Sequence, residues 1–469
     1  MIRPLFLLCF FAISTACLGQ SDRQPVFKTK ADSIQYVKIR EIRWGLGKSK
    51  PGDYVGMPKL RAYDSLNKAE EVLMKRATWQ YVYKPKKSFT PYADLKAGNV
   101  NPDSVIRLSI SYLRSAQIPK EVLLCKNLEE LELVNTRIDE LQDELSSLQK
   151  FVSVYLFNNI PSKKLILGKN DRINYLRIAG YHPNKMPKTY KNFTSLDSLN
   201  INRSMAARIP NLKNNKQLII LNAVENNITL KGYKKSSTLQ KLDLRKNKIT
   251  KVPNSIGRNY GSLNALSFNS NPVKKVKSGL GKLRELEYLS FYATGIKEIP
   301  PPVYKLTKLE AIDLYDNQIE FISPEIKNLQ QLKVLFLANN RLYSLPEEIG
   351  LLKNLEEVYV YNNRMDTLPA SMDKLEKLRV LWVNDNFFHT IPATTWRAGN
   401  VDYLDASQNF IKKVPDEITG APLSILILSG TLMNKERENP ELFERLRARG
   451  TRIIYYRADS DVVEEENEF

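Results

Sequence analysis

The stretch LEAIDLYDNQI, residues 309–319, decides how this chain folds. The same pattern returns 23 residues later as LKVLFLANNRL, residues 332–342. In both copies apolar residues occupy the first, fourth, sixth and eleventh positions, and asparagine occupies the ninth. Self-similarity at a fixed period of this length is the signature of a repeat architecture, so we interpret the rest of the chain in the frame of this repeat.

The repeat continues in both directions. About fifteen units follow one another at spacings of 21 to 24 residues, and they fill most of the 469-residue chain. Agreement on this scale does not arise by chance. The units begin near Val105 and at Leu128, Phe151, Ile173, Leu196, Leu218, Leu239, Leu263, Leu286, Leu309, Leu332, Leu355, Leu378, Val401 and Leu423.

The pattern of each unit predicts a short strand. Apolar residues at the fourth and sixth positions point to one side of an extended chain, and their neighbours point to the other side. Strands of successive units then stack into a parallel sheet. The sequence therefore predicts an α/β solenoid, a horseshoe with a parallel β-sheet on its concave face.

The asparagine at the ninth position predicts a structural ladder. Its side-chain amide can satisfy backbone groups of the adjacent turn that become buried when units stack. We assign this structural role, rather than a ligand role, to Asn226, Asn247, Asn271, Asn317, Asn340, Asn363, Asn386 and Asn409.

With these motifs the sequence resembles the leucine-rich repeat family, over roughly residues 105–456. The second half of the family motif is explicit in LPEEIGLL, residues 345–352. Among known classes it looks most like the 23-residue bacterial class, which is also similar to Ras-pathway repeat scaffolds. The match implies a solenoid whose variable surface residues, rather than its fold, determine the partner.

A solenoid needs caps at its two ends, because each end exposes an apolar cross-section. Residues 20–104 form a basic segment, in which the apolar spacing of residues 64–81 predicts a helical cap. The repeats span residues 105–433. A C-terminal cap over 434–458 combines a helix and a strand, and the acidic tail 459–469 has the composition of a disordered segment.

Residues 1–19 read as an export signal, with Arg3 followed by an apolar run and small residues. Cleavage before Gln20 is the first interpretation, lipoprotein processing at Cys17 is the second, and a buried N-terminal helix is the third. The first two predict an exported protein that is periplasmic, outer-membrane-associated or extracellular. We expect no transmembrane span in the mature chain.

The formal net charge is +20, but it is unevenly distributed. Residues 1–300 hold 51 Lys and Arg against 24 Asp and Glu, whereas residues 301–469 hold 20 against 27. Solvated lysine-rich faces are the simplest explanation, and contact with an anionic envelope surface is an alternative. Nucleic-acid binding is not expected, because the lysine pairs lie in loops and convex positions rather than on the concave strands.

No catalytic, metal or cofactor motif is recognisable. The stretch GLGKS, residues 45–49, lacks the glycine that a phosphate-binding loop requires at residue 42. Two histidines and one cysteine after the signal, Cys125, cannot form a usual zinc site. The sequence therefore predicts a protein that is not an enzyme and needs no cofactor.

One region of the concave face is rich in aromatic and acidic residues. Phe336, Tyr359 and Trp382 occupy the fifth position of three consecutive units, so neighbouring strands would align them. Such clusters are typical of recognition hot spots, although exposed strands also favour aromatic residues for packing alone. The predicted partner is a protein, with a glycan as the alternative. The predicted binding residues are Tyr288, Tyr292, Asp313, Tyr315, Phe336, Tyr359, Tyr361, Trp382, Asp385, Tyr403 and Asp405.

Overall fold

The computed structural model describes residues 23–26, 78–81, 89–161, 164–180, 187–233, 235–432 and 439–454. The chain divides into two compact units, Met1–Ser88 and Phe89–Phe469, which we describe separately. The expected export signal with Cys17 and the acidic tail 459–469 lie outside the described residues.

The described part of the first unit is a two-stranded hairpin-like pair. Strand β1 (Arg23–Val26) runs antiparallel to strand β2 (Thr78–Tyr81). The helix expected over residues 64–81 is therefore wrong at its last four residues, and residues 64–77 lie outside the described part. The segment 78–81 reads TWQY, and β-branched and aromatic residues of this kind favour a strand over a helix.

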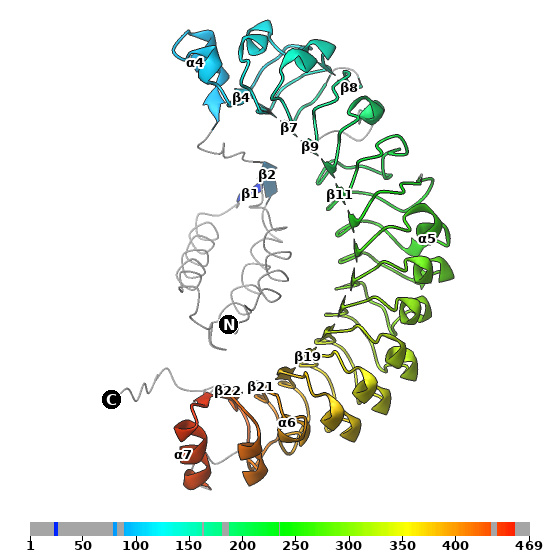
Figure 1. The fold of residues 1–469 in the computed structure, drawn as a ribbon, viewed down its shortest axis with the longest axis vertical. Coiled ribbons are helices and arrows are strands. Elements are labelled where there is room, and N and C mark those ends of the chain that lie inside the picture. The colour runs from blue at the N-terminus through cyan, green and yellow to red at the C-terminus, as the bar shows by residue number, and fades with distance from the viewer. Residues whose placement is uncertain are drawn as a thin grey trace. The chain divides into compact units, whose positions relative to one another are not determined.

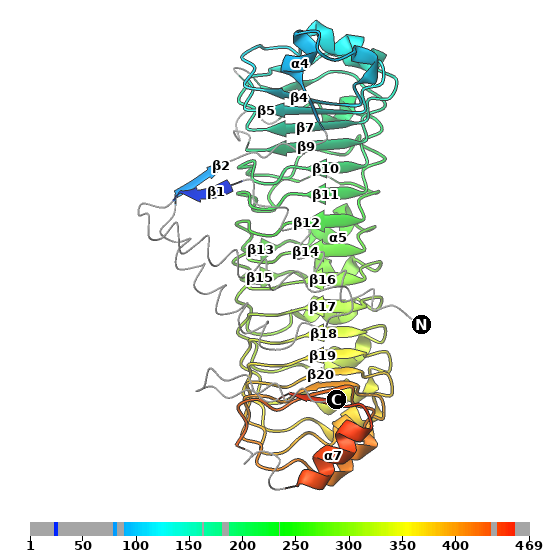
Figure 2. The same cartoon turned by 90° about the vertical axis from the view of Figure 1, so that its left-hand side faces the viewer.

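The second unit is built on one parallel sheet of seventeen strands, stacked in Figure 2. Each strand pairs with the equivalent residues of the next repeat, as Ile312 with Leu335 and Leu335 with Val358. The strands are β3 (Thr90–Pro91), β4 (Arg107–Ser111), β5 (Glu130–Val134), β7 (Ser153–Phe157), β9 (Tyr175–Ala179), β10 (Ser198–Asn200), β11 (Ile220–Asn222), β12 (Lys241–Asp243), β14 (Ala265–Ser267), β16 (Tyr288–Ser290), β17 (Ala311–Asp313), β18 (Val334–Phe336), β19 (Glu357–Tyr359), β20 (Val380–Trp382), β21 (Tyr403–Asp405), β22 (Ile425–Ile427) and β23 (Arg452–Ile454).

Within this unit the sheet strands line the inner side of a curved array, and short helices lie on its outer side (Figure 1). Most of these helices are single 3-10 turns that return the chain to the next strand. They are η1 (Pro102–Ser104), η2 (Lys120–Leu124), η3 (Asp143–Ser147), η5 (Tyr190–Asn192), η6 (Ser278–Lys282), η7 (Pro301–Lys305), η8 (Pro324–Asn328), η9 (Glu347–Leu351), η10 (Ala370–Lys374) and η11 (Asp416–Gly420), with the α-helices α4 (Tyr92–Lys96), α5 (Ser255–Asn259), α6 (Thr394–Arg397) and α7 (Pro440–Ala448). Two further strand pairs are β6 (Glu140–Leu141) with β8 (Ile166–Leu167), and β13 (Lys251–Val252) with β15 (Lys275–Val276).

The expected α/β solenoid with a parallel sheet on its concave face is confirmed. Apolar residues at the repeated positions form one continuous core between the sheet and the outer helices, from Leu95 to Leu446. Leu309, Ile312, Leu314 and Ile319 of the deciding stretch have no exposed surface. Each repeat of the sequence thus contributes one layer of buried side chains to the core.

The ninth-position asparagines are buried and fully hydrogen-bonded, as Asn340 illustrates. Its Nδ2 donates to the carbonyl oxygens of Leu314, Leu337 and Ala338, at 3.0, 2.9 and 3.1 Å. Its Oδ1 accepts from the backbone N–H of Ile319 at 2.9 Å. One side chain therefore joins two neighbouring repeats through four hydrogen bonds.

The C-terminal end of the sheet is closed by α7 and β23. Asn439 caps the helix by accepting from the N–H of Leu442 at 3.2 Å, and Pro440 occupies the first turn. Leu442, Phe443 and Leu446 are buried against the last repeat.

At the other end of the second unit, β3 pairs with β4, and α4 buries Leu95. Within the described residues, no helix combines the length and the apolar character that crossing a membrane requires.

Candidate functional site

Seven aromatic rings from six consecutive repeats form one contact network on the concave face, which we call the C-terminal aromatic cluster. Every neighbouring pair of rings has its centroids within 6.0 Å. The members are Tyr292, Tyr315, Phe336, Tyr359, Tyr361, Trp382 and Tyr403. All seven belong to the set that the sequence singled out.

The parallel register of the sheet places the central rings side by side. Phe336 pairs with Tyr359, and Tyr359 pairs with Trp382, on strands β18, β19 and β20. The rings of Phe336 and Tyr359 stack with centroids 4.5 Å apart, and Trp382 meets Tyr359 edge-on at 5.0 Å. Stacked and edge-to-face contacts of this kind are the favourable arrangements of aromatic pairs.

Hydrogen bonds hold two of the tyrosines in place. The Tyr359 hydroxyl donates to Oε2 of Glu357 at 2.7 Å, and Tyr359 is only 4% exposed. The Tyr315 hydroxyl accepts from Nδ2 of Asn339 at 2.7 Å. Tyr359 therefore supports the cluster from below, while the partly exposed Tyr315, Tyr361 and Trp382 present ring surface.

The three predicted aspartates lie in three different settings. Asp405 is completely buried and accepts from the N–H and Oγ of Ser407, so we do not expect it to touch a ligand. Asp385 is exposed and accepts from Nδ2 of Asn384 at 2.7 Å. Asp313 accepts from Oγ of Ser290 at 2.7 Å, and burial of its carboxyl raises its pKa to about 6.

Tyr288 lies on β16 at the edge of the cluster. It is partly exposed as a residue, but its hydroxyl is desolvated, and that desolvation, with the nearby Asp313, raises its pKa above the ordinary value. Its hydroxyl is thus neutral at every physiological pH.

A second group of rings, which the sequence analysis missed, lies on the same face near the other end of the sheet. We call Phe89, Tyr155, Phe157 and Tyr175 the N-terminal aromatic cluster. Tyr155 contacts the other three rings, with centroids 6.3, 6.5 and 5.3 Å away. Reading the third, fifth and seventh positions of the units at Phe151 and Ile173 would have revealed three of the four residues.

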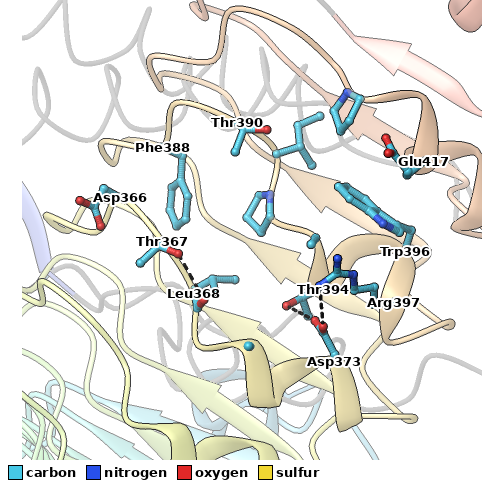
Figure 3. A pocket seen from close by; sticks show the side chains of 15 residues that line it. Asp366, Thr367, Leu368, Asp373, Phe388, Thr390, Thr394, Trp396, Arg397 and Glu417 are labelled. Atoms are coloured by element: carbon cyan, nitrogen blue, oxygen red, sulfur yellow. Dashed lines mark hydrogen bonds and ion pairs between the residues drawn. The ribbon is translucent and has the colours of Figure 1, made fainter.

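A pocket of about 390 Å³ lies away from the strands, between the second halves of three repeats (Figure 3). Phe388, Leu368 and Trp396 supply apolar walls. Oδ1 of Asp373 accepts from Oγ1 of Thr394 at 3.1 Å, and Oδ2 of Asp373 meets Nη1 of Arg397 at 3.3 Å. Asp373, Thr394 and Arg397 therefore bind one another within the pocket.

The remaining described residues offer no recognisable reaction centre. Cys125 is fully buried, and that burial raises the pKa of its thiol, so the thiolate nucleophile is disfavoured. Within the described ranges, His, Cys, Asp and Glu side chains nowhere gather in a group of three suited to a metal ion.

Two family models match the repeats. A model described as a leucine-rich repeat region matches residues 263–384, and one described as a leucine rich repeat matches residues 238–259. No curated protein sequence matches the chain significantly. The first match contains most of the C-terminal aromatic cluster.

Several solved structures are similar in fold. A leucine-rich repeat protein of Leptospira interrogans is 23% identical, with 80% of this chain and 100% of that chain covered and a TM-score of 0.58. The TLR13–ssRNA13 complex is 16% identical, covering 78% and 56%, with a TM-score of 0.62. The Toll–Spätzle complex of Drosophila is 16% identical, covering 69% and 42%, with a TM-score of 0.53. At these identities the likeness concerns the fold alone.

Proposed function

Since the chain is a leucine-rich repeat protein, we propose that it is a non-enzymatic module that binds a protein ligand on the C-terminal aromatic cluster. Leucine-rich repeat proteins are typically binding modules, and the fold generally mediates protein binding. The proposal adds the place of contact and the character of the partner.

The single observation that carries the proposal is the network of seven rings from six consecutive repeats. Aromatic side chains bury large areas at a low cost in side-chain entropy, and tyrosine and tryptophan are enriched at binding hot spots. Mutual packing and the Tyr359–Glu357 hydrogen bond fix the rings before a ligand arrives. Such preorganisation reduces the entropy lost on binding.

The charges around the cluster favour a basic partner surface. Asp316 and Asp385 are exposed on repeats that also supply cluster rings. Opposite charges on two partners speed their association and orient them relative to each other. We therefore expect the ligand to bring apolar and basic side chains to the cluster.

A photo-crosslinking capture tests the proposal. A crosslinking amino acid replaces the exposed Asn362 beside the cluster in one protein and the exposed Tyr343, outside the strands, in a matched control. Both proteins are mixed with a membrane extract of the native cell. We expect a protein adduct from position 362 that Trp382→Ala abolishes, and no such adduct from position 343.

A parallel experiment distinguishes a protein ligand from a glycan ligand. Aromatic rings beside carboxylates also suit sugar faces, so the purified chain is applied to a glycan array in parallel. Glycan binding that depends on Trp382, without any protein adduct, would contradict the proposed protein ligand.

We also propose that the protein is exported by a bacterium and acts at the cell envelope. Support comes from Arg3 and the apolar run of residues 5–13. Mass spectrometry of the mature N-terminus distinguishes a chain that begins at Gln20 from one acylated at Cys17. A full-length chain that still begins at Met1 in the cytoplasm would contradict export.

A further inference from the structure

We propose that the ligand is an extended polypeptide that reaches from the C-terminal aromatic cluster to the N-terminal aromatic cluster, which acts as a second anchoring subsite. This inference rests on the proposed function. It is carried by a separate set of residues, which lie on the same face of the same sheet, five strands away.

Tyr155 and Tyr175 are the partly exposed rings of the N-terminal aromatic cluster, and the buried Phe89 and Phe157 support them. Tyr155 packs against Tyr175 at 5.3 Å and against Phe157 at 6.5 Å, and the guanidinium of Arg177 lies 4.7 Å from the centre of the Phe157 ring. A cation over an aromatic face is attracted by the ring quadrupole and restrains both groups. The rings are therefore held in place before any ligand binds.

Exposed apolar side chains extend this cluster toward the first repeat. Ile106 and Tyr112, immediately before and after strand β4, are 48% and 75% exposed. They occupy the second and eighth positions of the first repeat, which are concave positions. Large apolar side chains left in water at both ends of one strand mark this part of the face as a place for a partner.

The strands between the two clusters form a mostly polar corridor, in which the apolar Ile219 is also 38% exposed. The concave positions of repeats 196–204, 218–226, 239–247 and 263–271 hold no aromatic residue. Two arginines of these repeats form ion pairs. Arg203 pairs with Glu225 at 2.7 Å, and Arg245 donates to both carboxylate oxygens of Asp243 at 2.7 to 3.0 Å. The exposed lysines at concave positions, Lys241 and Lys246, belong to a single repeat, so the corridor does not present the continuous positive row that a nucleic acid requires.

Amide side chains of the corridor suit a peptide main chain. Asn200, Asn202 and Asn222 lie on or beside β10 and β11, partly exposed at concave positions. Oδ1 of Asn200 and Oδ1 of Asn202 already accept from the backbone N–H of Asn202 and Val224, at 3.0 and 2.8 Å. An amide oxygen can accept a second hydrogen bond, from an N–H group of an extended chain. Two aromatic clusters separated by amide side chains are expected to fit a polypeptide that carries apolar residues at two separated points.

The spacing of the strands sets the length of this ligand. Tyr175 on β9 and Tyr288 on β16 are five strand steps apart, or roughly 24 Å at about 4.8 Å a step. An extended chain covers about 3.3 Å per residue, so at least about seven residues separate the two anchors. A six-residue peptide cannot reach both clusters.

The test uses displayed random peptides of twenty and of six residues, selected on the purified full chain. The affinity of one selected peptide of each length is then measured for three double variants: Tyr155→Ser with Tyr175→Ser, Tyr361→Ser with Trp382→Ser, and the flank control Ile160→Ser with Tyr343→Ser. Ile160 and Tyr343 are both 56% exposed. The four cluster residues are partly exposed and lie outside the continuous core, so these substitutions leave the core intact. Thermal melting checks that each variant is folded.

We expect the twenty-residue peptide to lose about 100-fold in affinity with either cluster variant, because two linked anchors reinforce each other. The six-residue peptide responds to one cluster only, and the flank control changes neither. A twenty-residue peptide that responds to Tyr361 and Trp382 alone overturns the second subsite and leaves the proposed function standing. Peptides that respond to neither cluster overturn both.

Discussion

The N-terminal and C-terminal aromatic clusters use the same positions of the repeat, but their surroundings differ. In the N-terminal cluster Tyr155, Phe157 and Tyr175 lie on the five-residue strands β7 and β9, and the Arg177 guanidinium lies over the Phe157 ring. In the C-terminal cluster Phe336, Tyr359, Trp382 and Tyr403 lie on three-residue strands, and the rings contact one another, as Phe336 stacks on Tyr359. A cation therefore contacts a ring of the first cluster, whereas the rings of the second contact one another.

The buried ladder differs between the same two regions. From Asn226 to Asn409 most repeats carry the ninth-position asparagine, whereas the second and fifth repeats carry Thr136 and Ser204. Thr136 donates one hydrogen bond, to Oδ1 of Asn159 at 2.8 Å. A hydroxyl makes fewer bonds than an amide, so the N-terminal repeats are tied to one another less firmly.

Removal of one ladder asparagine is expected to have the largest effect on stability. Asn340→Ala deletes four hydrogen bonds and leaves buried backbone groups of two repeats without partners, for a loss of about 2–4 kcal/mol. Thr136→Ala deletes one bond and costs about 1 kcal/mol. Denaturant unfolding of the two variants measures the difference, and equal losses would contradict the comparison.

A smaller effect is expected from the desolvated carboxyl at the edge of the C-terminal cluster. Burial raises the pKa of Asp313 to about 6, above its unfolded value near 3.9. The folded state thus binds the proton more tightly, and Asp313 reduces stability as the pH rises from about 4 to about 6. Asp313→Asn is expected to raise stability at pH 7 by about 1–3 kcal/mol.

Unfolding free energies between pH 4 and pH 7 check this prediction. The difference between wild type and Asp313→Asn is expected to be small at pH 4 and to grow toward pH 7. Asp243, at the same repeat position but bound to Arg245, provides the control, since Asp243→Asn breaks an ion pair and is expected to destabilise at pH 7. A pH-independent gain in Asp313→Asn would contradict the account.

The smallest expected effect concerns the eighth position of the repeat, where the backbone turns left-handed. Ala293 has φ 51°, which is unfavourable for a residue with a Cβ, so Ala293→Gly is expected to stabilise by about 0.5–1 kcal/mol. Gly180, the equivalent residue in the fourth repeat, has φ 73°, and an added Cβ would meet the side chain of Asn158. Thermal melting that showed Gly180→Ala to be neutral would contradict the steric reason.

Most of the fold could be predicted from the sequence, because aligning the 23-residue repeats gives the residue pairing between neighbouring strands. The pairing of Ile312 with Leu335 could be written down from the alignment alone. Residues 78–81 could not be placed as a strand, because their antiparallel partner, residues 23–26, lies far away in the sequence. Helical spacing over a short segment is overridden by such pairing.

The residues of the C-terminal aromatic cluster could be predicted from the sequence, but the burial of each side chain could not. Concave positions of the repeat identified all seven rings of the C-terminal cluster, whereas the burial of Tyr359 and Asp405 depends on how neighbouring side chains pack. The N-terminal cluster was missed because no single position of the repeat carries an aromatic residue in consecutive units there, as the fifth position does at Phe336, Tyr359 and Trp382. Only the register of β7 and β9 brings Tyr155, Phe157 and Tyr175 together.

The most direct test of the central claim is the dissociation constant of the captured protein ligand for the purified chain and for the variant with Tyr361→Ala and Trp382→Ala. We expect a loss of at least about 100-fold, since truncating two central hot-spot residues costs several kcal/mol, and no change in the control Tyr343→Ala. Both variants must retain the melting temperature of a folded solenoid. An unchanged dissociation constant in the folded double variant would contradict binding at the C-terminal aromatic cluster.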